Sequence, residues 1–117
     1  MSKLDSWDKV AAYALTLPGT EASTTYRMPA VKVAANGRGF VWTGGEPETS
    51  FALWLEPGLA EMLMETDPGT FWQSPHYAGS VVVLVRYSSD DPERVRSKIE
   101  QAYELARAMK PVRPRKK

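Results

Sequence analysis

The hydrophobic positions of the chain repeat with a helical period at both ends and with a strand period between them. Near the N-terminus, apolar residues follow the i, i+3, i+4, i+7, i+8 spacing of one buried helix face. These residues are Trp7, Val10, Ala11, Ala14 and Leu15. A similar stripe near the C-terminus consists of Val95, Ile99, Ala102, Ala106 and Met109. Asp5 or Ser6 is expected to cap the first helix. Asp90 or Asp91 is expected to cap the last one.

Between these helices, alternating or β-branched and aromatic segments predict strands. The predicted strands cover residues 23–26, 31–34, 40–43, 50–55 and 80–87. Asn36-Gly37 lies between the second and the third and predicts a tight hairpin, because both residues tolerate positive φ. Gly39 marks a candidate bulge in the returning strand.

A short helix is expected to begin near Pro57 and to bury Leu59, Met62 and Leu63. The pattern as a whole predicts an α+β protein with a single antiparallel sheet in the order α-β-β-β-β-α-β-α. The N- and C-terminal helices are expected to pack on one face of that sheet, which leaves the opposite face open. At 117 residues the chain fits one domain, assigned to residues 1–110 and followed by a basic, flexible tail at 111–117.

The open face matters because strand alternation assigns aromatic residues to it. If Phe51 faces the helices, Trp54 must face the other way. By the same rule Phe40 and Trp42 share one face, opposite to Val41. A tryptophan pair exposed on the open face would form a surface for a ligand, nucleic acid, a protein partner or a second copy of the chain.

Residues 70–79 are expected to be irregular, or at most a short edge strand interrupted by Pro75. Two interpretations of this segment stay open. It either folds over the open face and covers the tryptophans, or it leaves them exposed there. As a further hypothesis, a small-molecule site between the sheet and this segment would be lined by Trp72, His76 and Tyr77.

The residue inventory offers no catalytic or metal-binding constellation. The chain has no cysteine and a single histidine, so neither a disulfide nor a multi-ligand metal site is expected. Neither a G-x-S-x-G motif, a G-x-G-x-x-G motif nor a P-loop occurs. We therefore expect a binding protein without metal or cofactor rather than an enzyme. The longest apolar run, 81–85, is too short to span a bilayer, and we expect a cytoplasmic protein without membrane contact.

The net charge of +1 is unevenly distributed along the chain. Five of the fifteen basic residues lie in the last eight positions, which leaves ten basic and fourteen acidic residues in 1–109, a balance of −4. The stretch between Glu21 and Glu46 nevertheless contains no acidic residue. Arg27, Lys32 and Arg38 all fall there, and they are the candidate phosphate contacts of the folded part.

Several segments resemble the MmcQ/YjbR family, whose fold is similar to that of the bacterial frataxin CyaY. The segment "ALTLPGTEAS" resembles the end of the family's first helix and its Leu-Pro-Gly motif. "TYRMPAVKVAANGRGFVW" resembles its aromatic-x-x-Pro-x-x-Lys-Val strand and the Gly-rich turn after it. "SVVVLVRY" and "DDPERVRSKIEQAYELARAMKP" resemble its last strand and final helix.

The resemblance implies a CyaY-like α+β sandwich and no established catalytic activity. For some members it implies a double-wing mode of DNA binding, in which Lys32 and Arg38 would be basic contacts of the first wing with Arg27 beside them. Iron binding is not carried over from the frataxins. Their first helix is strongly acidic, whereas this chain offers only Asp5 and Asp8 there.

Overall fold

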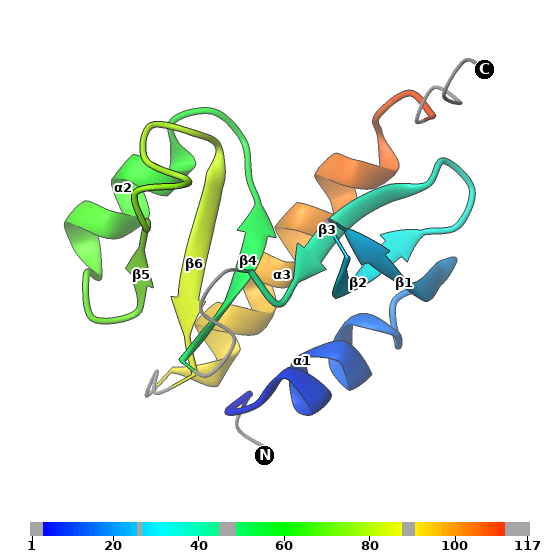
Figure 1. Cartoon of the computed structure of the whole chain (residues 1–117), viewed down its shortest axis with the longest axis horizontal. Helices are drawn as coiled ribbons and strands as arrows, with labels where there is room; N and C mark the ends of the chain where they lie inside the picture. Colours follow the sequence, from blue (N-terminus) through cyan, green and yellow to red (C-terminus); the bar gives the residue numbers. More distant parts are fainter. Residues whose placement is uncertain (1–3, 26, 45–48, 88–90, 112–117) are drawn as a thin grey trace.

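The computed structural model describes residues 4–25, 27–44, 49–87 and 91–111. Its six strands form one antiparallel sheet in the order β1-β2-β3-β4-β6-β5 (Figure 1). The strands are β1 (Thr20–Thr25), β2 (Met28–Val33), β3 (Arg38–Trp42), β4 (Ser50–Trp54), β5 (Phe71–Trp72) and β6 (Val82–Arg86). The helices are α1 (Trp7–Ala14), α2 (Leu59–Thr66) and α3 (Pro92–Arg107).

The predicted α+β class, single antiparallel sheet and element order are confirmed, with β5 as the short edge strand. Residues 112–117, most of the predicted tail, lie outside the described residues, as do Tyr26 and Asp90. The division into a domain and a tail therefore stays a prediction. Within the described ranges, no helix is long and apolar enough to cross a membrane.

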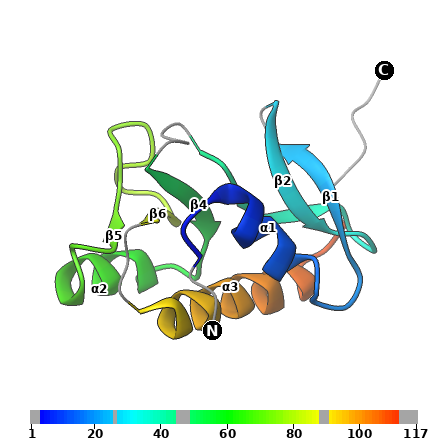
Figure 2. The same cartoon turned by 90° about the horizontal axis from the view of Figure 1, so that it is seen from below.

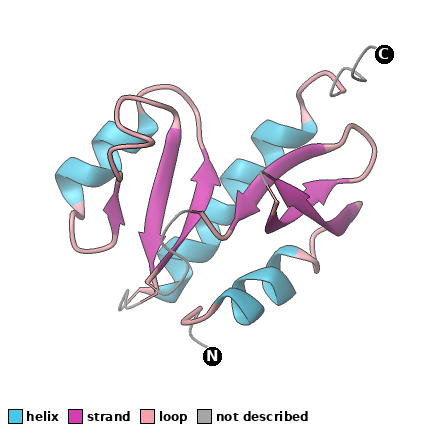
Figure 3. Cartoon of the chain, in the orientation of Figure 1, coloured by secondary structure: helices cyan, strands magenta, loops and turns pink. Residues whose placement is uncertain are grey.

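All three helices pack on the same face of the sheet, as predicted for the two terminal ones. One buried cluster joins Val10 of α1, Leu63 of α2 and Ile99 of α3 to inward residues of the strands. The strand members of this cluster are Val31, Val33, Phe40, Val41, Phe51, Leu53, Phe71, Val83 and Val85. Figures 2 and 3 show the helices lying against the sheet from two directions, with α3 running along its length.

The helix ends follow the capping chemistry that the sequence predicts. The Ser6 side chain accepts a hydrogen bond from the backbone N–H of Lys9, and Asp91 accepts one from Arg94. Two apolar residues assigned to buried stripes are exposed instead, Leu15 at 42% and Met62 at 51%. Leu15 follows the last residue of α1, and α2 begins only at Leu59, so its buried side is formed by Ala60 and Leu63.

The third strand departs from strict alternation. Lys32 pairs with Gly39 and Val31 with Val41, so Phe40 is an extra residue in β3, a β-bulge. Because of this bulge, Phe40 and Val41 both face the helices, whereas Trp42 faces the opposite side. The prediction that Phe40 and Trp42 share a face is therefore wrong. The matching prediction for β4, with Phe51 and Trp54 on opposite faces, is confirmed.

Tyr87 carries a buried hydroxyl that has no hydrogen-bond partner in the described part of the chain. Burial, with the charge of Asp8 as a smaller cause, raises the pKa of Tyr87 to about 12. Since an unpartnered buried hydroxyl costs about 1–3 kcal/mol, we expect Tyr87→Phe to increase the free energy of unfolding by about 1 kcal/mol at neutral pH. Urea denaturation measures this change.

The same substitution has a pH signature. The folded state holds the Tyr87 proton more tightly than the unfolded state, whose tyrosine pKa is 10.0. The corresponding stability is complete below this value and is lost as the pH rises from about 10 to about 12. Tyr87→Phe should reduce that loss without abolishing it, because the pKa of Tyr13 is also raised to about 12. An unchanged alkaline profile would contradict the assignment.

Candidate functional site

The face of the sheet opposite the helices carries a second, smaller hydrophobic cluster. Its buried members are Ala30, Trp42, Ala52, Tyr77, Val82 and Leu84, with Met28, Trp54 and Trp72 packed at its margin. None of these residues comes from a helix. Tyr77 belongs to the loop between β5 and β6, so this loop covers part of the face that the sequence left open.

Hydrogen bonds from one side chain hold the loop in place. The Gln73 amide donates to the carbonyl oxygens of Ser80 (3.0 Å) and Val82 (2.7 Å), and its oxygen accepts from the N–H of Gly79 at 3.3 Å. The loop is thereby closed on itself, and Tyr77 is turned toward the sheet. There the indole N–H of Trp42 donates to the Tyr77 hydroxyl at 3.2 Å.

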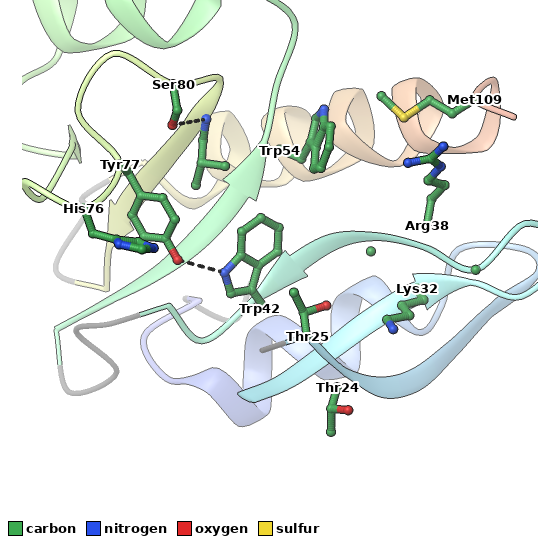
Figure 4. Close-up of a pocket in the computed structure, with 13 residues that line it drawn as sticks. Thr24, Thr25, Lys32, Arg38, Trp42, Trp54, His76, Tyr77, Ser80 and Met109 are labelled. Carbon is green, nitrogen blue, oxygen red and sulfur yellow. Dashed lines mark hydrogen bonds between the residues drawn. The ribbon is translucent and has the colours of Figure 1, made fainter. Parts of the chain in front are cut away.

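Beyond the covered part lies a cavity of about 660 Å³, between β1, β2, β3 and β4 on one side and the loop on the other (Figure 4). It is lined by Thr24, Thr25, Lys32, Gly37, Arg38, Gly39, Trp42, Trp54, His76, Tyr77, Ser80, Val82 and Met109. We call it the sheet-face cavity. None of its lining residues is acidic, although the described chain as a whole contains many carboxylates.

Five of the seven predicted site residues line this cavity, namely Lys32, Arg38, Trp42, Trp54 and His76. The basic stretch and the tryptophan face, which the sequence suggested separately, therefore meet in one place. Arg27 and Trp72 do not line it. Arg27 has a φ of 66° in the turn between β1 and β2 and is exposed.

Trp72 has a structural environment of its own. Its indole N–H donates to the Ser50 hydroxyl at 2.9 Å, and the Arg86 guanidinium lies 4.8 Å from the centre of its ring. Of the three residues predicted to line a small-molecule pocket, His76 and Tyr77 line this cavity, whereas Trp72 does not.

The two tryptophans of the cavity differ in their exposure. Trp42 is 2% exposed under Tyr77, while Trp54 is only partly buried. The two interpretations of this face each hold in part: the loop covers Trp42, and Trp54 still faces the cavity (Figure 4). A homodimer or protein-interaction surface here stays a prediction, with the partly exposed Trp54 rather than the buried Trp42 as its aromatic residue.

Arg38 is held against the end of α3. Its Nε donates to the carbonyl oxygen of Lys110 at 2.8 Å. The neighbouring Asn36 donates to Ala106 and Met109 in the same region. The hairpin predicted at Asn36-Gly37 is confirmed, with a loop of four residues, 34–37, in which only Gly37 has a positive φ, 71°. Instead of protruding, the hairpin end is fixed to the helix.

Lys32 is less constrained. No described residue forms an ion pair with it, although Glu21 is its cross-strand neighbour on β1. A glycine beneath it makes room for its side chain. A Cβ at Gly39 would lie 3.0 Å from the Thr25 hydroxyl oxygen and 3.6 Å from Cγ of Lys32. Because Gly39 has no side chain, the side chains of Thr25 and Lys32 can lie close against its backbone.

The arrangement suits the binding of an anion that carries an apolar or aromatic part. Lys32 and Arg38 supply positive charge, Trp54 supplies an aromatic ring, and Thr25 and Ser80 supply hydroxyl groups. Across the described residues, no group of three or more histidine, aspartate or glutamate side chains could hold a metal ion. The sequence missed Thr25 and Ser80 as lining residues, because hydroxyl residues in strands and loops carry no distinctive pattern.

Comparison with known proteins places the chain in a family. The family model YjbR matches residues 15–105, so the chain belongs to the YjbR family, as the sequence motifs indicated. The crystal structure of protein DR2400 of Deinococcus radiodurans, described by its family-model domain DUF419, has the same fold, with a TM-score of 0.75. At 16% identity it covers 92% of this chain, and the match spans 82% of that chain. No curated protein matches the sequence significantly.

Proposed function

We propose that this YjbR-family protein is a non-enzymatic binding protein that takes nucleic acid at the sheet-face cavity. The observation that carries the proposal is the convergence of Lys32, Arg38 and Trp54 around one cavity without an acidic lining residue. Cationic side chains provide phosphate contacts, and aromatic rings provide stacking surfaces for bases. The double-wing mode that the family resemblance implies would use the same part of the sheet.

The charge distribution indicates that nucleic acid would be attracted by a few local cations rather than by the overall charge of the folded part. Residues 1–109 carry a net charge of −4, so this part of the chain does not attract a polyanion strongly through its overall charge. Attraction must then come from the few cations that face the ligand. We assign the phosphate contacts to Lys32 and Arg38, with Arg27 at the β1–β2 turn as an outer contact.

Removing the two cavity cations is expected to weaken nucleic-acid binding at least about tenfold. Because each phosphate contact contributes about one to the slope of log K against log salt, Lys32→Ala combined with Arg38→Ala should reduce that slope by about 2. Fluorescence anisotropy of the full chain with labelled DNA, offered as a single strand and as a duplex at several salt concentrations, measures both quantities.

The matched control removes two cations from the helices that pack on the other face. Lys9→Ala combined with Lys98→Ala changes the net charge by the same amount and should leave the affinity and the slope nearly unchanged. A chain ending at Lys110 tests the basic tail and keeps the carbonyl group that Arg38 contacts. No binding of either DNA form at tens of micromolar protein overturns the proposal. Binding lost only on truncation moves the site to the tail.

A further inference from the structure

The sheet-face cavity has two walls of different chemistry. Lys32 and Arg38, from β2 and β3, form a cationic wall, and Trp54, from β4, stands on the aromatic side (Figure 4). At about 660 Å³ the cavity lies within the range of about 300–1,000 Å³ that holds one small-molecule-sized group. Its size therefore fits one unit of a polymer rather than the side of a double helix.

Trp54 is the aromatic residue that remains available for stacking. Trp42 is 2% exposed, and its N–H is already used by Tyr77. Trp54 keeps part of its surface in the cavity. Its indole N–H has no hydrogen-bond partner among the described residues. The ring is thus open to a ligand on the cavity side.

Lys32 and Arg38, which form the cationic wall, keep donor groups available for an anion. The contact between Arg38 Nε and the Lys110 carbonyl oxygen fixes the guanidinium and leaves its two terminal nitrogens without a protein partner in the described ranges. Lys32 has no ion-pair partner there either. A fixed guanidinium fork and a flexible ammonium group together suit the tetrahedral oxygens of a phosphate group.

We infer that the sheet-face cavity receives one unpaired nucleotide, with its base on Trp54 and its phosphate between Lys32 and Arg38. This inference rests on the proposed function and narrows it to single strands. In a duplex both faces of each base are covered by neighbouring bases, so Trp54 cannot stack and only the phosphate contacts remain. In a single strand one base can leave its neighbours at low cost and enter the cavity.

The test compares three ligands on the full chain: a short labelled oligothymidylate, a labelled duplex of the same length, and free thymidine monophosphate. We expect the single strand to bind at least about tenfold more tightly than the duplex, and the free nucleotide to bind more weakly than the strand. Trp54→Leu should weaken the strand about tenfold, in the range of one lost base–aromatic stack, and should leave duplex binding unchanged. Trp54→Phe, which keeps a smaller ring, should weaken the strand by about threefold.

Trp72→Phe is the matched control, because Trp72 lies at the margin of the same hydrophobic cluster without lining the cavity. It should leave the strand affinity unchanged. Where Trp54→Leu does not fold by circular dichroism, Trp54→Phe carries the test alone. Equal affinity for strand and duplex, with both Trp54 variants unaffected, overturns the unpaired-nucleotide inference and leaves the proposed function standing on the effect of Lys32 and Arg38. A free nucleotide that binds as tightly as the strand overturns the single-strand assignment and makes the cavity a mononucleotide site.

Discussion

Replacing Phe40 with alanine is expected to lower the free energy of unfolding by about 3–5 kcal/mol. The Phe40 ring is fully buried and meets Tyr103 of α3 edge to face, with ring centroids 5.7 Å apart and planes at 69°. The substitution removes this aromatic contact and leaves a cavity between the sheet and its longest helix. Urea denaturation followed by circular dichroism measures the change, and the m-value should stay close to that of the unaltered protein.

A leucine at the same position separates ring loss from volume loss. Phe40→Leu keeps most of the buried apolar surface and should cost less than half as much as Phe40→Ala. Gly39 is unsuitable as a neighbouring control, because any side chain there would press on Thr25. A cost below about 1 kcal/mol for Phe40→Ala would contradict the placement of this ring in the helix-side core.

The alternation of hydrophobic residues predicts correctly which face of the sheet each side chain occupies in β4, but not in β3. In β4 the register to β6 is regular over five residue pairs, so Phe51 and Trp54 fall on opposite faces as alternation requires. In β3 the inserted residue Phe40 breaks the alternation, so Phe40 and Val41 share the helix-side face and Trp42 faces the opposite side. Gly39 signalled a bulge, but a glycine does not indicate which neighbour is the inserted residue. The partner strand decides that, through the pairs Lys32–Gly39 and Val31–Val41.

The candidate site was predictable in its charges and in one of its tryptophans. The gap in acidic residues identified Lys32 and Arg38, and the face rule identified Trp54. They meet because β2, β3 and β4 are neighbours in the sheet, an order that consecutive antiparallel strands favour. The cover of Trp42 by Tyr77 was one of two open interpretations. What selects it is the set of hydrogen bonds from Gln73 to its own loop, which no local pattern reveals.

Asn36→Ala should destabilise the protein by about 2 kcal/mol, since it removes three hydrogen bonds from a buried residue. The Asn36 amide nitrogen donates to the carbonyl oxygens of Ala106 (2.8 Å) and Met109 (3.1 Å), and its oxygen accepts from the backbone N–H of Arg38 at 3.0 Å. The carbonyl groups at a helix C-terminus lack intrahelical donors, so Asn36 takes the place of such a donor at the end of α3. Thermal and urea denaturation measure the loss.

Asn36→Asp tests which of these bonds matters. Aspartate keeps the acceptor for Arg38, but it loses both donors and places a negative charge against the negative end of the helix dipole. We therefore expect Asn36→Asp to be at least as destabilising as Asn36→Ala. An Asn36→Asp variant as stable as the unaltered protein would show that the two hydrogen bonds from Asn36 to the end of α3 do not stabilise the fold.

The Asn36→Ala variant also tests how Arg38 is positioned for binding. Arg38 donates a hydrogen bond to the carbonyl oxygen of Lys110, and Lys110 directly follows Met109, whose carbonyl oxygen accepts a hydrogen bond from Asn36. Asn36→Ala should therefore also weaken nucleic-acid affinity, although it removes no charge. Unchanged affinity in a folded Asn36→Ala protein would show that Arg38 is positioned without the help of this loop.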